Sequence, residues 1–287
     1  MNKIGFNVLC WSAHVSDALW PEIERLKHIG YDGIEFAMSS TDPAVYRRLG
    51  THLRELEMEA TAVLVVLADE NPVSPDAAVR QRGLDRLKQA IDHAAAAGAT
   101  VLCGPIHSAF ATFTRNEPQD EEYSRSAEVL HAAGEHAAQA GIVLAVEALN
   151  RFECYLCNTA AQLARLVGRV AHPSVRAMFD THHANIEEKS FTAAIETLQP
   201  WLAHVHISEN DRGAPGDGHV PWPEVFSALA RANYRGWLTI EAFTRADPEF
   251  ANAINVWRTF SETRRIAEAG HDFIRRGMDA ARSLEAP

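Results

Sequence analysis

The sequence predicts one α/β domain in which eight parallel strands, each followed by a helix, close into a (β/α)8 barrel, the TIM barrel fold. Three observations predict this fold class. Short apolar runs alternate with longer amphipathic segments, which is typical of a parallel sheet with crossover helices. Eight such pairs occupy about 250 residues, the usual length of this barrel. No Ser-, Gly- or Pro-rich linker interrupts the series, so residues 1–287 are predicted to form a single domain.

Eight apolar runs are the predicted strands, and several lack polar residues on both faces, as strands buried under helices do. They span residues 3–9, 33–37, 60–67, 100–104, 142–147, 175–180, 202–207 and 237–241. Amphipathic segments between them predict helices, among them residues 21–29, 43–56, 76–97 and 121–139. Gly30, Gly98 and Gly141 follow three of these helices, and glycine is the residue best suited to end a helix.

Two points of the architecture have alternatives. From about residue 250 the C-terminal stretch is predicted to be a helical extension, longer than one crossover requires, which either closes the bottom of the barrel or packs against another subunit. The alternative fold is a doubly wound open sheet. That fold usually has a Gly-rich phosphate-binding turn after its first strand, and the segment Val8-Leu9-Cys10-Trp11-Ser12 is not one.

The bulk composition narrows the class of function. The net charge is −11, whereas nucleic acids and anionic membranes favour a basic face, so neither is an expected partner. No run approaches the roughly 18 apolar residues of a membrane span, and no apolar signal segment is apparent. The four cysteines form no dense framework, which favours a reducing, cytoplasmic location. Cys154-x-x-Cys157 lacks the second pair that a zinc site needs, and we interpret it as coincidental.

Four predicted strands end in a side chain that can bind a metal ion. These are Glu147, Asp180, His206 and Glu241, each about one strand–helix unit from the next. Because the C-terminal strand ends of a barrel converge on one mouth, we expect the four side chains to meet there. Charged groups at buried strand ends are costly unless they are paired or bound to metal. Three carboxylates and one imidazole favour Mn²⁺, Mg²⁺ or Co²⁺ over a thiolate-type zinc site.

The loops that follow these strands carry further motifs. They read Glu147…Asn150-Arg151-Phe152-Glu153…Asn158-Thr159, Phe179-Asp180-Thr181-x-His183-x-Asn185-Ile186-Glu187-Glu188, His206-x-x-Glu209-Asn210-x-Arg212-Gly213-x-x-Gly216-x-Gly218-His219-x-x-Trp222 and Glu241-x-Phe243. Together they resemble the sugar isomerase/epimerase superfamily of xylose-isomerase-like barrels. Within it they resemble the ketose 3-epimerase branch, the D-tagatose and D-allulose 3-epimerases. The resemblance covers nearly the whole chain, and the motifs around Asp180 and His206 are the specific ones.

The resemblance implies roles for individual residues. Glu147, Asp180, His206 and Glu241 would bind the metal, usually manganese, and Glu147 and Glu241 would also be the acid/base pair. The residues implied to hydrogen-bond the O1–O3 end of the ketose are Glu153, His183 and Arg212. It also implies a homodimer or homotetramer.

The chemistry of such a reaction suits these residue types. Epimerisation of a free ketose at C3 removes a weakly acidic proton next to a carbonyl and passes through a cis-enediolate, which a divalent cation bridging O2 and O3 stabilises. Inversion needs one base on each face of the planar intermediate, and two glutamates on different strands can supply them. We expect a free sugar because the loops contain no Gly-rich phosphate cradle.

Three positions depart from the family pattern. Asn7 and Val15 stand where related sequences tend to have aromatic residues, and His107 stands where tyrosine is common. We expect these positions to contact the C4–C6 end of the sugar, although a loop hydrogen bond is the simpler interpretation of His107.

Three other functions remain open at this point. An aldose–ketose isomerase, or a hydroxypyruvate-type isomerase, would use much the same metal site. A DNA-repair endonuclease of the AP type shares the barrel and several ligands, but the chain is acidic and no histidine stands near the end of the third predicted strand. A sugar-binding barrel without catalysis is the third, and two bases beside a metal argue against it.

Overall fold

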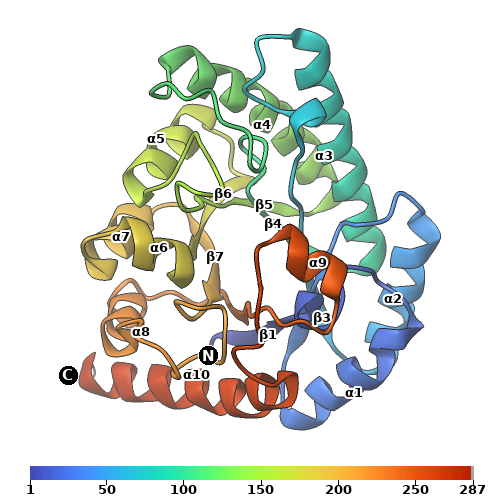
Figure 1. Ribbon diagram of the computed structural model, residues 1–287, viewed down its shortest axis with the longest axis vertical. Coiled ribbons are helices and arrows are strands. Elements are labelled where there is room, and N and C mark those ends of the chain that lie inside the picture. Colours follow the sequence, from blue (N-terminus) through green and yellow to red (C-terminus); the bar gives the residue numbers. More distant parts are fainter. Residues whose placement is uncertain (286–287) are drawn as a thin grey trace.

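Eight parallel strands close into a barrel in sequence order, and helices surround it (Figure 1). The computed structural model describes residues 1–285. The strands are β1 (Lys3–Asn7), β2 (Gly33–Ala37), β3 (Glu59–Val63), β4 (Ala99–Gly104), β5 (Val143–Val146), β6 (Val175–Asp180), β7 (Leu202–Ile207) and β8 (Trp237–Ile240). Each strand pairs with the next and β8 pairs with β1, which confirms the predicted fold class.

The helices of the outer ring follow the strands. They are α1 (Trp20–Ile29), α2 (Pro43–Glu55), α3 (Ala77–Ala97), α4 (Asp120–Ala140), α5 (Ala160–Val170), α7 (Phe191–Leu198), α8 (Trp222–Arg231) and α10 (Thr263–Glu285). Gly30, Gly98 and Gly141 end α1, α3 and α4 in the left-handed region, with φ of 115°, 81° and 70°, as their sequence positions predict. Helix α10 packs against α8 and α1, so it completes the ring beside β8.

Two short helices lie outside this ring. Helix α6 (Thr181–Glu187) begins directly after β6, and α9 (Pro248–Ala253) lies between β8 and α10. Figure 1 shows α9 inside the ring of outer helices, on the side of the barrel where the strands end. The carboxylate of Asp247 caps α9 by accepting a hydrogen bond from Phe250 N at 3.1 Å, and its other oxygen accepts one from Ala13 N at 3.1 Å. The first loop of the barrel therefore holds α9 in place.

Two predicted strands are longer than the observed ones. The first stops at Asn7, whose side-chain oxygen accepts a hydrogen bond from Leu9 N at 3.0 Å and caps the 3-10 helix η1 (Val8–Cys10). The third stops at Val63, so residues 64–67 belong to the loop before η3 (Ala68–Glu70). Leu9, Leu64 and Val65 of these stretches line the mouth of the barrel, whereas Val8 and Val66 are buried in the core. A further 3-10 turn, η2 (Asp17–Leu19), precedes α1.

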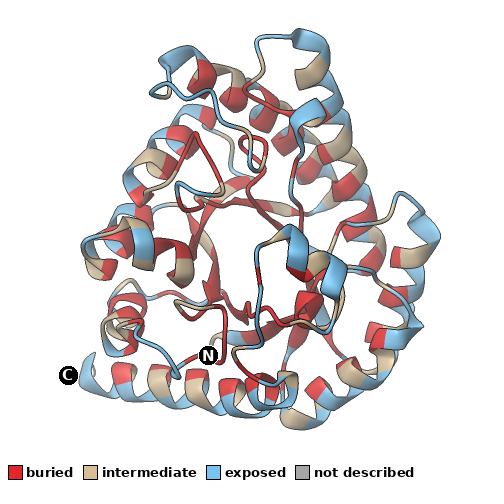
Figure 2. Ribbon diagram, viewed as in Figure 1, coloured by how far each residue is buried: buried red, intermediate tan, exposed pale blue. Residues whose placement is uncertain are grey.

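The core lies between the barrel and the inward faces of the helices, where Figure 2 shows the buried residues, with exposed residues on the outer faces. The inside of the barrel is more polar than usual, since the side chains of Glu35, Thr61, His204 and Thr239 are almost completely buried there. Such groups need partners within the protein, and the contacts among Glu35, Thr61 and His204 form part of the site described below. Among residues 1–285, no helix is both long and apolar enough to cross a membrane.

Candidate active site

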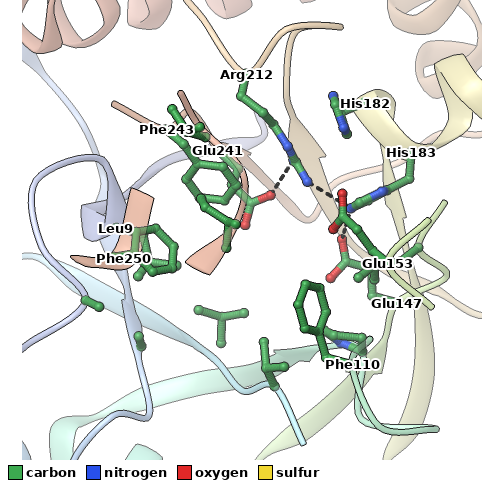
Figure 3. Close-up of a pocket in the computed structure, with 18 of the residues that line it drawn as sticks. Leu9, Phe110, Glu147, Glu153, His182, His183, Arg212, Glu241, Phe243 and Phe250 are labelled. Atoms are coloured by element: carbon green, nitrogen blue, oxygen red, sulfur yellow. Dashed lines mark hydrogen bonds and ion pairs between the residues drawn. The ribbon is translucent and has the colours of Figure 1, made fainter. Parts of the chain in front are cut away.

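The strand ends surround a cavity of about 460 Å³ at the mouth of the barrel. Figure 3 shows the side chains that line it, with charged groups gathered at one end and hydrocarbon side chains at the other. A cavity of this size is in the usual range for small-molecule sites, and the C-terminal mouth is where barrel enzymes carry their active sites.

The structure brings together the four residues predicted at the strand ends. One ligand atom each from Glu147, Asp180, His206 and Glu241 lies within 4.8 Å of the other three. The Nδ1 atom of His206 is 3.4 Å from Glu241 Oε1, 3.5 Å from Asp180 Oδ2 and 3.9 Å from Glu147 Oε1. All four residues are buried.

Local structure orients each group. Asp180 is the last residue of β6 and caps α6, because its Oδ1 accepts hydrogen bonds from His182 N at 2.6 Å and His183 N at 3.0 Å. Its other oxygen, Oδ2, is therefore left to face the cluster. Glu147 and Glu241 each follow directly after a strand, and their backbone N–H groups continue the ladder by donating to carbonyl groups of the preceding strand.

The charged groups of the cluster shift one another's pKa values. Burial, together with the carboxylates of Glu241 and Asp180, raises the pKa of Glu147 well above its usual range. Burial also opposes ionisation of Asp180, but neighbouring cationic groups, Arg212 among them, outweigh it and hold the pKa of Asp180 well below its usual value. The pKa of His206 is raised because the carboxylates near it, Glu241 first, outweigh the effect of burial. Three carboxylates this close together repel one another unless positive charge lies between them.

The donor set fits a divalent cation. Within residues 1–285, Glu147 Oε1 and His206 Nδ1 are buried and have no hydrogen-bond partner, although both point into the cluster. Buried polar atoms are normally satisfied, so two orphaned atoms facing each other mark a place for a further ligand. Three carboxylate groups and one imidazole are ligands suited to Mn²⁺, Co²⁺ or Mg²⁺.

Glu35 on β2, which sequence reasoning missed, holds the histidine of this cluster from behind. Its Oε1 is 2.7 Å from His206 Nε2, and its Oε2 is 2.9 Å from His204 Nε2. The same carboxylate accepts hydrogen bonds from Asn7 Nδ2 and Thr61 Oγ1, both at 2.9 Å. When Nε2–H is donated to Glu35, a cation in the cluster can take the place of the proton on Nδ1 and bind the lone pair of that atom, as in a metal-ligating histidine. The one signal for Glu35 in the sequence is that a glutamate interrupts a predicted apolar strand.

The residues predicted to bind the sugar head group also lie at this end of the cavity, where Glu153, His183 and Arg212 all line the wall. Arg212 Nη1 donates to Glu241 Oε2 at 2.7 Å, and Arg212 Nη2 lies 3.0 Å from His183 Nε2 (Figure 3). Glu153 Oε1 accepts a hydrogen bond from Asn150 Nδ2 at 2.8 Å.

His183 is surrounded by hydrogen-bond donors. Burial and the cation of Arg212 lower its pKa well below 6.5, although Asp180 opposes them. The backbone N–H of Asn150 donates to His183 Nδ1 at 3.1 Å, and the guanidinium of Arg212, which can only donate, lies 3.0 Å from Nε2. The same Nε2 atom lies 3.7 Å from Glu147 Oε1.

Arg212 itself is held in an uncommon backbone conformation. Its φ is 65°, in the left-handed region that a non-glycine residue seldom adopts. Two backbone hydrogen bonds secure it, from Arg212 N to Glu209 O at 3.0 Å and from Phe243 N to Arg212 O at 2.9 Å. The guanidinium also stacks over the ring of Phe243, 4.8 Å from its centre. Strain of this kind is found where a side chain must point in one direction for function.

The structure corrects the expectation for the C4–C6 end of the sugar. Asn7 is buried under the metal cluster, where its Nδ2 donates to Glu35 and lies 3.3 Å from Glu241 Oε1. Val15 lies in a separate hollow beside α2. His107 is completely buried, 3.7 Å from the thiol of Cys154, and burial lowers its pKa to about 4. None of the three expected positions is among the residues that line the cavity.

The thiols give no support for a redox or zinc role. Cys154 and Cys157 are free and buried, and burial raises the pKa of both. Cys154 Sγ is 3.1 Å from Ser108 Oγ.

Comparison with known proteins agrees with this geometry. The family model described as xylose isomerase-like TIM barrel matches residues 23–277. The chain is 33% identical to a D-psicose 3-epimerase of Agrobacterium fabrum, covering 94% of this chain and 95% of that protein. It is 31% identical to an L-ribulose 3-epimerase of a Methylomonas species, covering 89% and 90%.

Solved structures lead to the same group. An L-ribulose 3-epimerase superposes with a TM-score of 0.92 at 29% identity, covering 99% of this chain and 97% of that one. A D-allulose 3-epimerase from Methylomonas in complex with D-allulose superposes with a TM-score of 0.89, also at 29% identity, covering 96% of both chains. The chain therefore belongs to the xylose isomerase-like TIM barrel family and, within it, to the ketose 3-epimerases, which are carbohydrate epimerases of the isomerase class.

Proposed function

We propose that this enzyme epimerises a free ketose at C3 through a cis-enediolate, with a divalent metal ion, Mn²⁺, at Glu147, Asp180, His206 and Glu241. One observation carries the proposal. Of the four clustered residues, only Glu147 and Glu241 line the cavity, whereas Asp180 and His206 do not. The two glutamates extend from β5 and β8 and lie across from each other in Figure 3. They are therefore the two groups that can reach opposite faces of a bound sugar.

The residues would act as follows. Glu147, Asp180, His206 and Glu241 would hold the metal ion, which would supply positive charge that stabilises the negative charge of an enediolate. One glutamate, Glu147 or Glu241, would take the C3 proton from one face of the ketose, and the other would return a proton to the opposite face. Arg212 would donate hydrogen bonds to the oxygens of the head group, the ring of His183 would form a further hydrogen bond with it, and the carboxylate of Glu153 would accept one from a hydroxyl group.

Sugar phosphates are poorer candidates than free sugars. Arg212 is the one arginine on the cavity wall within residues 1–285, and it already lies against Glu241 and Asp180. A phosphate would need several donors that are not engaged by carboxylates.

The test is a panel of free ketoses and their phosphates, each assayed with Mn²⁺, Co²⁺ or Mg²⁺ and again after chelation, with products identified by chromatography. We expect a ketose with inverted C3 as the product, with free sugars as substrates, and with no turnover after chelation. An aldose as the sole product would establish the rival aldose–ketose isomerase. Full activity in the chelated enzyme would overturn the metal site.

We also expect a homodimer or homotetramer. Large apolar side chains are exposed on loops around the mouth, with Phe152 72% and Trp257 67% exposed. Phe152 follows β5 and Trp257 follows α9, and a partner subunit that covers the mouth would remove such aromatic side chains from water. Light scattering coupled to size-exclusion chromatography measures the assembly, and a monomer at micromolar concentration would contradict the expectation.

A further inference from the structure

The end of the cavity far from the metal cluster is lined by hydrocarbon. We define the distal wall as Leu9, Val63, Phe110, Phe250, Ile254 and Val256, all of which line the cavity. Leu9, Val63 and Val256 are buried, and the other three are half-buried. They come from the loops after β1 and β4, from the end of β3 and from the α9 segment. Figure 3 shows Leu9, Phe110 and Phe250 as the hydrocarbon groups that face the charged end.

Polar side chains are scarce on this wall. The charged and amide groups of the cavity come from the loops after β5, β6, β7 and β8, that is, from the end where the metal cluster lies. Within residues 1–285, the other polar side chains that line the cavity are Ser39, in the loop after β2, and Asn255, after α9, and both are exposed to solvent. They are therefore placed at the opening of the cavity.

The position of the wall decides which part of a ketose it meets. If O1 to O3 of the sugar occupy the end near Arg212 and His183, the remaining carbons extend toward the distal wall. A hydroxyl group there gives up hydrogen bonds to water and finds few on the protein, whereas a methyl group gains contact with Leu9, Phe250 and Ile254.

We propose that the substrate class of this enzyme is the 6-deoxyketohexoses, ketoses whose C6 is a methyl group. This inference rests on the proposed function and specifies its substrate. A terminal methyl group has the size and polarity that the wall accommodates. A ketopentose such as L-ribulose has no C6 to place against the wall, and an ordinary ketohexose brings a hydroxymethyl group to it.

The experiment compares matched pairs of sugars. D-Fructose with 6-deoxy-D-fructose, and D-allulose with 6-deoxy-D-allulose, are assayed in the presence of Mn²⁺, together with L-ribulose. We expect kcat/KM for the deoxy sugar to exceed that of its partner and of L-ribulose by about tenfold or more, in line with the discrimination that one group achieves in an apolar pocket.

Variants of the distal wall separate its effect on kcat/KM from the effect of ring opening of the sugars in solution. A 6-deoxyketose cannot form the six-membered ring, so more of it is open-chain, but this difference is the same for every variant of the enzyme. Phe250→Tyr and Ile254→Asn each add a polar group to the wall, and we expect each to lower the deoxy-to-hydroxy ratio of kcat/KM at least threefold. Ile186→Asn is the matched control, because Ile186 on α6 is 37% exposed and is not among the cavity-lining residues.

The outcomes are distinct. A deoxy-to-hydroxy ratio of kcat/KM of one or less in the wild-type enzyme overturns the inference, and so does a preference for L-ribulose. A high ratio that neither Phe250→Tyr nor Ile254→Asn lowers, compared with Ile186→Asn, also overturns it, since ring opening would then account for the preference. If Ile254→Asn fails to fold, Phe250→Tyr still decides the question. Epimerisation of hydroxylated and deoxy ketoses at equal rates refutes only this inference, whereas no epimerisation of any ketose refutes the proposed function.

Discussion

Glu147 and Glu241 differ from Asp180 and His206 in their access to the cavity, although all four lie in one cluster. This difference supports a division of labour that their identities alone do not show. A carboxylate that contacts both the metal and the substrate can transfer protons, whereas a ligand beneath the cavity floor can only hold the ion. The catalytic predictions at this scale therefore concern the two glutamates.

Glu241→Gln keeps the size of the side chain but removes a base. We expect kcat to fall by about 10²- to 10⁴-fold, the usual contribution of an acid/base group. The variant should still exchange the substrate proton next to the carbonyl on the face served by Glu147, so deuterium from D₂O would enter the starting ketose without inversion. Measured metal content separates this loss from loss of the ion. Epimerisation at nearly the wild-type rate would refute the two-base mechanism.

Glu35→Gln tests the support behind His206. The amide cannot supply the charge that the carboxylate places 2.7 Å from His206 Nε2, so we expect Mn²⁺ affinity to weaken roughly 10- to 100-fold. Competition with a fluorescent chelator measures this affinity without any need for activity. Thr61→Val is the matched control, because it removes a 2.9 Å hydrogen bond to Glu35 but leaves the contact with His206. Equal affinities for the two variants would contradict the positioning role.

At the scale of elements, the two helices outside the ring, α6 and α9, contribute to different parts of the site. Helix α6 starts at Asp180, so a cluster residue and a helix cap are the same side chain. Helix α9 and the residues that follow it contribute Phe250, Ile254 and Val256 to the cavity. A short helix with one apolar face and few partners is among the least stable parts of a protein.

Asp247→Ala should loosen α9. It removes the hydrogen bonds to Phe250 N and Ala13 N, and the loss of such a cap costs about 1 kcal/mol. We expect faster amide exchange in the peptide that contains α9, and a higher KM with little change in global melting temperature. Asp272→Ala is the control, because Asp272 is an exposed residue of α10 whose ion pair with Arg275 is on the surface. Equal exchange of the α9 peptide in both variants would show that the cap is unimportant.

At the scale of the whole molecule, the proposed metal site joins distant parts of the chain. Its four residues lie at the ends of β5, β6, β7 and β8, and Glu35 adds β2, so binding of an ion there would be linked to closure of the barrel. A ligand that binds only the folded state stabilises a protein by about 2.7 kcal/mol when the ligand concentration is 100 times the Kd.

Chelation should therefore lower the melting temperature, and Mn²⁺ should restore it in proportion to the logarithm of its concentration. Scanning calorimetry of the metal-free and titrated enzyme measures the shift. Asp180→Asn, which weakens a ligand, should reduce the response to Mn²⁺. A melting temperature that does not change between chelator and millimolar Mn²⁺ would exclude a folded-state metal site.

The sequence by itself determined the fold class and the membership of the metal cluster. Alternating apolar runs specify strands under helices, and parallel strands of a barrel end at one mouth, so polar residues at Glu147, Asp180, His206 and Glu241 had to converge. Glu153, His183 and Arg212, which the family resemblance implies for the head group, line the cavity because they belong to motifs directly attached to those strands.

Only the tertiary structure decided what surrounds the cluster. Glu35 is 171 residues from His206, and nothing local in an apolar strand shows which histidine its carboxylate will reach. Asn7, Val15 and His107 were expected at the sugar, but each side chain points elsewhere. Strand periodicity specifies which residues face inward, whereas the direction of a side chain in a loop depends on caps, on neighbouring loops and on packing, all of which form only when the barrel closes.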